Sequence, residues 1–169
     1  MRWVRLQWCS ITHATALFTA IGKDGRTLRM LDLQGNNLSS VESSLFIPPL
    51  QFLEGLYLNG TKLTTHQVET ILDGLGNASN LTHLRLDGNV SQVDSAKLVK
   101  VNHLKVVTLW PTHISIQQIM EILEASMTTT KLDRMQLGHE NLGLRFAIDG
   151  TMATGARTYV KIDSGVLWC

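Results

Sequence analysis

One spacing of apolar residues recurs along most of the chain. In residues 28–38, Leu28, Leu31, Leu33 and Leu38 occupy positions 1, 4, 6 and 11 of a frame, and the polar residue Asn36 occupies position 9. The frame begins again at residues 1, 53, 81, 104 and 132. A unit of this length cannot bury its apolar side chains alone, so neighbouring units must stack to form a continuous core.

The units alternate in length. The intervals between their starts are alternately longer and shorter, and residues 28–80 align with residues 81–131 in both halves of the pair. In two of the longer units, Thr64 with Gln67 and Ser115 with Gln118 have the spacing of a capping box, and apolar residues at helical spacing follow. The shorter units, through Pro48 and Pro49 and through residues 93–102, are expected to form abbreviated helices or turns.

Position 9 of the frame holds, in order, Cys9, Asn36, Thr61, Asn89, Thr112 and Glu140. Only Glu140 breaks an alternation of Asn with Cys or Thr. The pattern over residues 1–142 resembles the ribonuclease-inhibitor-like class of leucine-rich repeats, also found in NOD-like immune receptors. The resemblance implies an α/β fold, a curved right-handed leucine-rich repeat solenoid. Parallel strands would line its concave face, and helices or turns its convex face.

The position 9 side chains are expected to be buried. A polar side chain there can pair with backbone groups of the turn that the next unit covers, so we expect a structural polar ladder. A cysteine in this row is expected to be structural rather than catalytic. The ladder would consist of Cys9, Asn36, Thr61, Asn89 and Thr112.

Residues 143–169 admit two interpretations. A degraded seventh unit beginning at residue 157 would place Val160, Ile162 and Leu167 at positions 4, 6 and 11, although Arg157 breaks position 1. The alternative is a hairpin-like cap or an unrelated tail. Neither end of the chain has a clear capping sequence, which suggests either a longer parent chain or self-association through the exposed ends.

Composition excludes several partners. Fifteen Lys and Arg residues balance fourteen Asp and Glu residues, so no basic surface is expected for nucleic acid or an anionic membrane. No apolar run is long enough to span a membrane, and the apolar stretch from Trp8 to Ile21 is interpreted as part of the fold. Two distant cysteines, Cys9 and Cys169, favour a reducing compartment and a cytoplasmic protein.

No pattern of catalytic or metal-binding residues emerges. The glycine-rich segments at residues 22–27 and 59–62 lack the spacing of a phosphate-binding loop, and the six histidines do not pair with other ligands at metal-site spacing. The sequence therefore predicts no enzyme activity, no metal and no cofactor.

Positions 3, 5 and 7 of each strand should point away from the core, because side chains alternate across a strand. Among them, Tyr57, Arg85, Asp87 and Trp110 are predicted to form a central partner-binding cluster, since Trp, Tyr and Arg dominate binding hot spots. Trp3 is a weaker candidate because at an uncapped end it can cover the core instead. Further candidates on the same face are Asp32, His83 and Arg134.

These features favour a protein–protein interaction module: a receptor, adaptor or scaffold segment. The alternative is a regulator of an enzyme. A ribonuclease inhibitor would need an acidic face to meet a basic enzyme, and this face is near neutral. A GTPase-activating protein of the leucine-rich repeat type would carry an acidic tail that is missing here. A sensor of nucleic acid or lipid would need a basic face.

Overall fold

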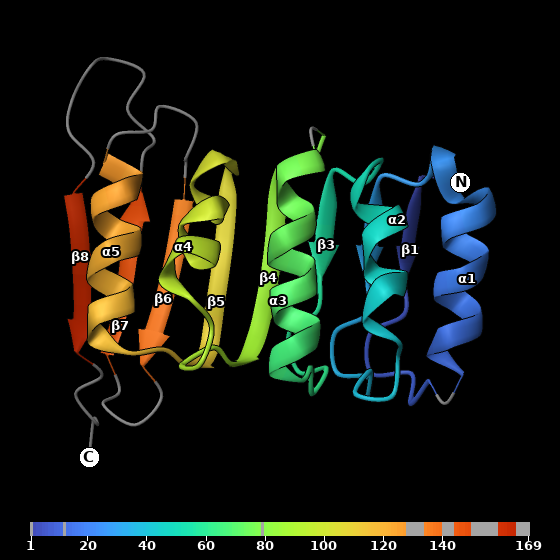
Figure 1. Cartoon of the computed structure of the whole chain (residues 1–169), viewed down its shortest axis with the longest axis horizontal. Coiled ribbons are helices and arrows are strands. Elements are labelled where there is room, and N and C mark those ends of the chain that lie inside the picture. Colours follow the sequence, from blue (N-terminus) through green and yellow to red (C-terminus); the bar gives the residue numbers. More distant parts are fainter. Residues whose placement is uncertain are drawn as a thin grey trace.

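A computed structural model describes residues 2–11, 13–78, 80–127, 134–139, 144–149 and 159–164. The fold is α/β. Within these residues, eight strands form one sheet in the order β1 to β8, and the helices lie on one face of it (Figure 1). We call the opposite face, which carries positions 3, 5 and 7 of the repeat frame, the open face.

The first six strands are parallel, and their register follows the repeat frame. Position 3 of each unit pairs with position 3 of the next, from Trp3 to Met30 and Gly55 and onward to Arg134. Each of the six strands therefore begins at frame position 3. Their bounds are β1 (Trp3–Arg5), β2 (Met30–Asp32), β3 (Gly55–Tyr57), β4 (His83–Asn89), β5 (Val106–His113) and β6 (Arg134–His139).

The connections alternate as the unit lengths predict. The three longer units contain the helices α1 (Ala14–Asp24), α3 (Thr65–Gly74) and α5 (Ile116–Met127). The shorter units contain one-turn helices, α2 (Ile47–Leu50) after a 3-10 turn at Ser43–Phe46, and α4 (Ser95–Leu98) before a 3-10 turn at Val99–His103. Further 3-10 turns follow α1 at Gly25–Thr27 and α3 at Leu75–Asn77. The predicted abbreviated helices are confirmed.

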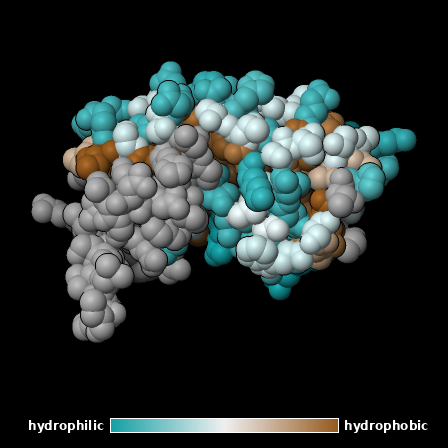
Figure 2. All heavy atoms as spheres, turned by 90° about the horizontal axis from the view of Figure 1, so that it is seen from below, coloured by the Kyte–Doolittle hydropathy of each residue, from teal (hydrophilic) through white to brown (hydrophobic). Residues whose placement is uncertain are grey.

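The core lies between the sheet and the helices. The leucines at frame positions 1, 4 and 6 of the second and third units are almost fully buried, and so are Val68, Ile71 and Leu72 on the inner side of α3. The apolar N-terminal stretch contributes α1, whose Phe18 ring meets Phe46 edge to face with 4.7 Å between ring centroids. No helix in the described ranges combines the length and apolar character that crossing a membrane requires. The surface seen in Figure 2 is largely hydrophilic where the structure describes it, with smaller hydrophobic patches.

The predicted capping boxes form, and each also joins two units. The Gln67 backbone N–H donates to Thr64 Oγ1 at 3.2 Å, and the Thr64 N–H donates to Gln67 Oε1 at 2.8 Å. The Gln67 amide nitrogen then donates to the carbonyls of Leu38 at 2.9 Å and Val41 at 2.6 Å, in the preceding unit. One buried side chain thus caps its own helix and pairs two backbone carbonyls of its neighbour.

The same device recurs one pair of units later. Gln118 and Ser115 exchange the capping-box bonds, and the Gln118 amide donates to Val90 O at 3.0 Å and Val93 O at 2.8 Å. Because this glutamine interaction occurs in both units, it is a feature of the repeat.

The C-terminal strands depart from the repeat. β7 (Leu144–Asp149) pairs antiparallel with β6, and β8 (Tyr159–Ser164) pairs antiparallel with β7. The expected seventh unit is therefore wrong, since a further repeat would add a parallel strand, and the hairpin-like alternative fits the pairing. The connection from His139 to Leu144 is too short for the crossover that parallel strands need, so the chain can only turn back.

We predict that Gln67→Leu lowers the free energy of unfolding by about 2–4 kcal/mol, because the Leu38 and Val41 carbonyls and the Thr64 N–H lose a buried partner. Urea unfolding followed by circular dichroism measures the change. Gln117→Leu is the matched control, since Gln117 is exposed on α5, and its effect should stay within about 0.5 kcal/mol. Equal effects of the two substitutions would contradict the role given to Gln67.

Candidate binding surface on the open face

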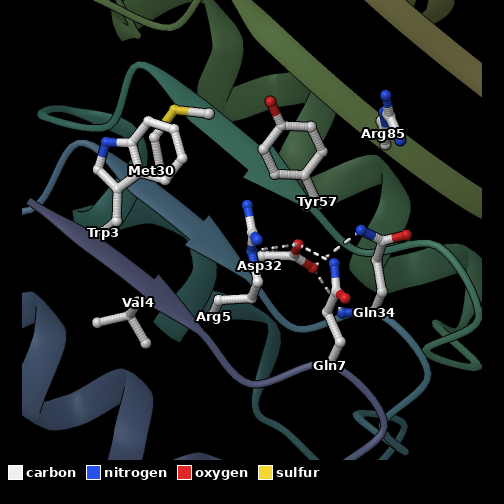
Figure 3. A pocket seen from close by; sticks show the side chains of 9 residues that line it. All are labelled: Trp3, Val4, Arg5, Gln7, Met30, Asp32, Gln34, Tyr57 and Arg85. Atoms are coloured by element: carbon white, nitrogen blue, oxygen red, sulfur yellow. Dashed lines mark hydrogen bonds and ion pairs between the residues drawn. The ribbon is translucent and has the colours of Figure 1, made fainter.

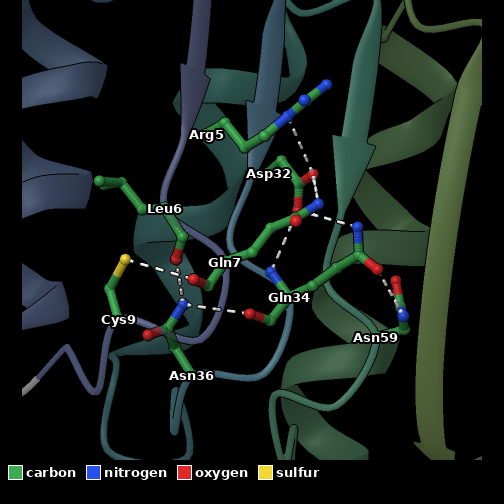
Figure 4. A network of polar contacts seen from close by, with 8 residues as sticks. All are labelled: Arg5, Leu6, Gln7, Cys9, Asp32, Gln34, Asn36 and Asn59. Atoms are coloured by element: carbon green, nitrogen blue, oxygen red, sulfur yellow. Dashed lines mark hydrogen bonds and ion pairs between the residues drawn. The ribbon is translucent and has the colours of Figure 1, made fainter.

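The polar ladder forms where a unit covers the position 9 side chain. Asn36 is buried, and its amide nitrogen donates to Leu6 O at 2.6 Å (Figure 4). The same nitrogen donates to Leu33 O at 2.8 Å, and Asn36 Oδ1 accepts from the Ile11 N–H at 3.1 Å. Thr61 is also buried, and its hydroxyl donates to Leu58 O. These side chains satisfy turn backbone that would otherwise be buried unpaired.

Cys9 corrects the ladder prediction. Its side chain is exposed, and its thiol donates only to the Gln7 carbonyl at 3.3 Å. Cys9 belongs to the first unit, and no described unit packs outside β1 to cover it. The side chains of the other two predicted members, Asn89 and Thr112, lie outside the described part of the structure.

A hollow of about 270 Å³ opens on the open face above β1, β2 and β3. Figure 3 shows Trp3, Met30 and Tyr57 around it, while Val4 points away, toward the core that it packs against. The residues lining the hollow come from the first four units: Trp3, Val4, Arg5, Gln7, Met30, Asp32, Gln34, Tyr57 and Arg85.

Two of the predicted residues, Tyr57 and Arg85, form one pair at the hollow. They are in register on β3 and β4, and the Arg85 guanidinium lies over the Tyr57 ring, 5.1 Å from its centroid. Burial of the ring raises the pKa of Tyr57 above its ordinary value, against the opposing effect of the Arg85 charge. Tyr57 is therefore a neutral, half-buried aromatic surface with a cation stacked upon it.

Asp32 lies at the base of the hollow rather than on its rim. It is 7% exposed and accepts hydrogen bonds from the Gln7 side chain, from the Gln34 N–H at 3.2 Å and from the Gln34 amide at 3.0 Å. Arg5 approaches the same carboxylate, with 3.9 Å between Nε and Oδ2. These bonds hold the outward side chains of the first two units together.

The position 7 row is largely occupied with its own hydrogen bonds. The Asn59 amide donates to Gln34 Oε1 at 2.8 Å. Asp87 accepts from the N–H of Gly60, a residue whose φ of +73° favours glycine. Two buried oxygens of this row, Asn59 Oδ1 and Asp87 Oδ1, have no hydrogen-bond donor among the described residues. Asp87 thus holds the turn of the neighbouring unit, a role that its predicted place beside Tyr57 did not suggest.

The tryptophans differ from expectation. Trp3 is 60% exposed, so it lines the hollow instead of covering the core. Trp110 lies where the register of β5 with both neighbours shifts, between Leu109 and Thr112, so the frame no longer places it opposite Asp87. Pro111 follows it, and a proline cannot donate to the sheet. The side chain of Trp110 lies outside the described residues, as does that of Arg134.

His83 is placed at position 3 of β4, next to Gly55 and partly exposed, and it does not line the hollow. Met30 and Arg5 do line it, although neither is among the binding residues predicted from the sequence. A signal was present in Gly55: an outward-facing glycine leaves a gap in its row. A Cβ at Gly55 would lie 2.6 Å from the Met30 thioether, which fills that space.

The described residues contain no group of three His, Cys, Asp or Glu side chains that could hold a metal ion. The hollow itself offers guanidinium groups, amides, aromatic rings and one carboxylate that is already hydrogen-bonded. Such a surface can recognise a ligand by shape, charge and hydrogen bonds.

We predict that Asp87→Asn raises the free energy of unfolding at pH 7 by up to about 1 kcal/mol, because an amide keeps the Gly60 bond and adds a donor to a row with an unpaired oxygen. Burial raises the pKa of Asp87. The folded state therefore binds the Asp87 proton more tightly than the unfolded state, and the wild-type chain gains stability as pH falls through the raised pKa. The advantage of the variant should shrink over that window and level off below about pH 4.

Asp73→Asn is the control with the opposite sign. Hydrogen bonds from Lys100 at 2.9 Å and Lys97 at 3.0 Å lower the pKa of Asp73, so its charge stabilises the folded state above its ordinary pKa. That variant should lose stability at pH 7 and approach the wild type in acid. Thermal unfolding from pH 3 to pH 8 measures both, and parallel curves for wild type and Asp87→Asn would contradict the assignment.

Comparison with known proteins adds no family: no family model matches the chain, and no solved structure matches it.

Proposed function

We propose that this chain is a leucine-rich repeat solenoid that binds another protein through the open face of its sheet, as an adaptor, receptor or scaffold segment. In this proposal the open face is the concave side. The fold is supported by the parallel pairing of equivalent frame positions in six successive units and by helices confined to the other face. The resemblance of the position 9 row to ribonuclease-inhibitor-like repeats points the same way.

The observation that carries the function is the hollow with its exposed aromatic and arginine side chains. Trp3 and Tyr57 stand at its sides, and Arg85 is stacked on Tyr57. Large exposed aromatic residues beside arginine are the side chains that contribute most to protein interfaces. A packed network beneath them, from Gln7 through Asp32 to Gln34, holds the surface in shape before a partner arrives.

Regulation of an enzyme remains the second proposal for the same face. The lining of the hollow carries two arginines, Arg5 and Arg85, and one carboxylate, Asp32. That balance does not favour a basic enzyme such as a ribonuclease. A GTPase-activating role has no specific observation in its favour.

We propose a reducing compartment, the cytoplasm, as the place of action. Cys9 is exposed and unpaired within the described part of the chain. An exposed thiol of this kind persists where glutathione keeps thiols reduced.

The test is affinity capture from an extract of the source cells, with the wild-type chain and two matched double variants. Tyr57→Ala with Arg85→Ala should reduce the recovery of a specific partner more than about tenfold, because two hot-spot side chains are lost. Ile116→Ala with Met120→Ala changes two exposed apolar residues of α5, on the helical face, and should leave recovery unchanged.

Circular dichroism and thermal unfolding first establish that each variant folds. If the Ile116→Ala, Met120→Ala variant loses a partner that the Tyr57→Ala, Arg85→Ala variant retains, the partner binds the helical face and the proposal is contradicted.

A further inference from the structure

Four outward side chains of the hollow stand in one row. Arg5, Asp32, Tyr57 and Arg85 occupy frame position 5 on β1, β2, β3 and β4, and each is in register with the next. Adjacent strands are about 4.8 Å apart, so the backbones at Arg5 and Arg85 are separated by about 14 Å. The row therefore has a cation at each end and a carboxylate and an aromatic ring between them.

The carboxylate in this row has little hydrogen-bonding capacity left for an incoming ligand. Asp32 is almost fully buried, and its oxygens already accept three hydrogen bonds from Gln7 and Gln34. A carboxylate has about four acceptor sites, and the Arg5 approach at 3.9 Å uses part of the remainder. Its acceptor sites are therefore occupied by its own neighbours, and of the two arginines it faces Arg5 more closely.

The two guanidinium groups, in contrast, keep most of their hydrogen-bonding capacity. The Arg5 side chain is 64% exposed and contacts Asp32 only through Nε at long range. Arg85 is exposed, and no carboxylate lies within ion-pair distance of it among the described residues. Stacking on Tyr57 occupies the flat face of the Arg85 group and leaves its in-plane N–H donors for a ligand.

Beside this row, frame position 3 of the first three units is apolar, since Trp3, Met30 and Gly55 lie in register there. Met30 lies over Gly55, whose missing side chain makes room for the thioether, and the Trp3 and Tyr57 rings stand on either side. An apolar or aromatic side chain of a ligand can settle on this floor, because the thioether and the rings offer a polarisable contact surface.

We infer that the hollow binds an acidic segment of the partner protein in which an apolar or aromatic side chain is flanked by two carboxylates. The apolar side chain contacts Met30 and Tyr57, and the carboxylates pair with Arg5 and Arg85. An extended peptide advances about 3.3 Å per residue, so carboxylates about four residues apart match the spacing of the arginines. This inference rests on the proposed function, since it names the partner chemistry of the same face.

The probe is a fluorescein-labelled peptide with two glutamates four positions apart, one phenylalanine midway between them, and glycine and serine elsewhere. Fluorescence anisotropy at low salt should show saturable binding. The same peptide with glutamine in place of glutamate should bind at least about tenfold more weakly, and a lysine version should not bind. Raising the salt from about 50 mM to 500 mM should weaken the glutamate peptide selectively.

Variants of this chain locate the site. Arg5→Gln and Arg85→Gln should each weaken binding of the glutamate peptide about three- to tenfold. Arg85→Lys should weaken binding less than Arg85→Gln does, because lysine keeps the charge but lacks the planar fork. Lys23→Gln, which removes an exposed cation from the last turn of α1, is the matched control and should have no effect. Unchanged thermal unfolding of each variant separates loss of a contact from loss of the fold.

Equal binding of the glutamate and glutamine peptides would overturn the inference, and so would equal weakening by Lys23→Gln. Displacement of the peptide by short single-stranded RNA at lower concentration than by unlabelled peptide would overturn the choice of a protein ligand. If no peptide binds while partner capture still depends on Tyr57 and Arg85, the inference fails and the proposed function stands. If capture does not depend on them, the proposed function itself fails.

Discussion

The stack of units depends on buried side-chain amides that reach back to the backbone of the preceding unit. Leucine burial makes stacking favourable. It also buries carbonyl groups of the turns, and the parallel strands do not pair these carbonyls. Asn36 pairs such groups on the sheet side, and Gln67 and Gln118 pair the Val41 and Val93 carbonyls beneath the helices. Without them the apolar units would bury unpaired carbonyls, and part of the gain from stacking would be lost.

The spacing of side chains within each unit explains which parts of the fold could be predicted. Frame positions 1, 4 and 6 fill the core of the second to fifth units, so counting from Leu28 was enough to place the start of β2 and, by repetition, of the other parallel strands. The capping boxes at Thr64 and Ser115 marked two helices. What the spacing could not show is that Gln67 serves two units at once, since the Leu38 and Val41 carbonyls that it bonds lie more than twenty residues away.

Predictions failed where a residue has no described repeat unit on one side. Cys9 fits the frame as well as Thr61 does, yet it is exposed, because burial at position 9 requires a unit on both sides. Val160 and Ile162 also fit the frame, but their strand runs antiparallel to β7. A frame records which side chains point inward, and it does not record the direction in which a strand joins the sheet.

The candidate site shows a similar division. Alternation along a strand correctly placed Tyr57 and Arg85 on one face and side by side, because register carries position 5 from one strand to the next. It could not show that the neighbours of an outward side chain consume its hydrogen bonds. Asp32 and Asp87 have the same residue type and the same outward direction as a binding carboxylate, but one holds two glutamine side chains in place and the other holds a turn. The hydrogen-bonding capacity left for a ligand therefore lies with the arginines, although the carboxylates point in the same direction.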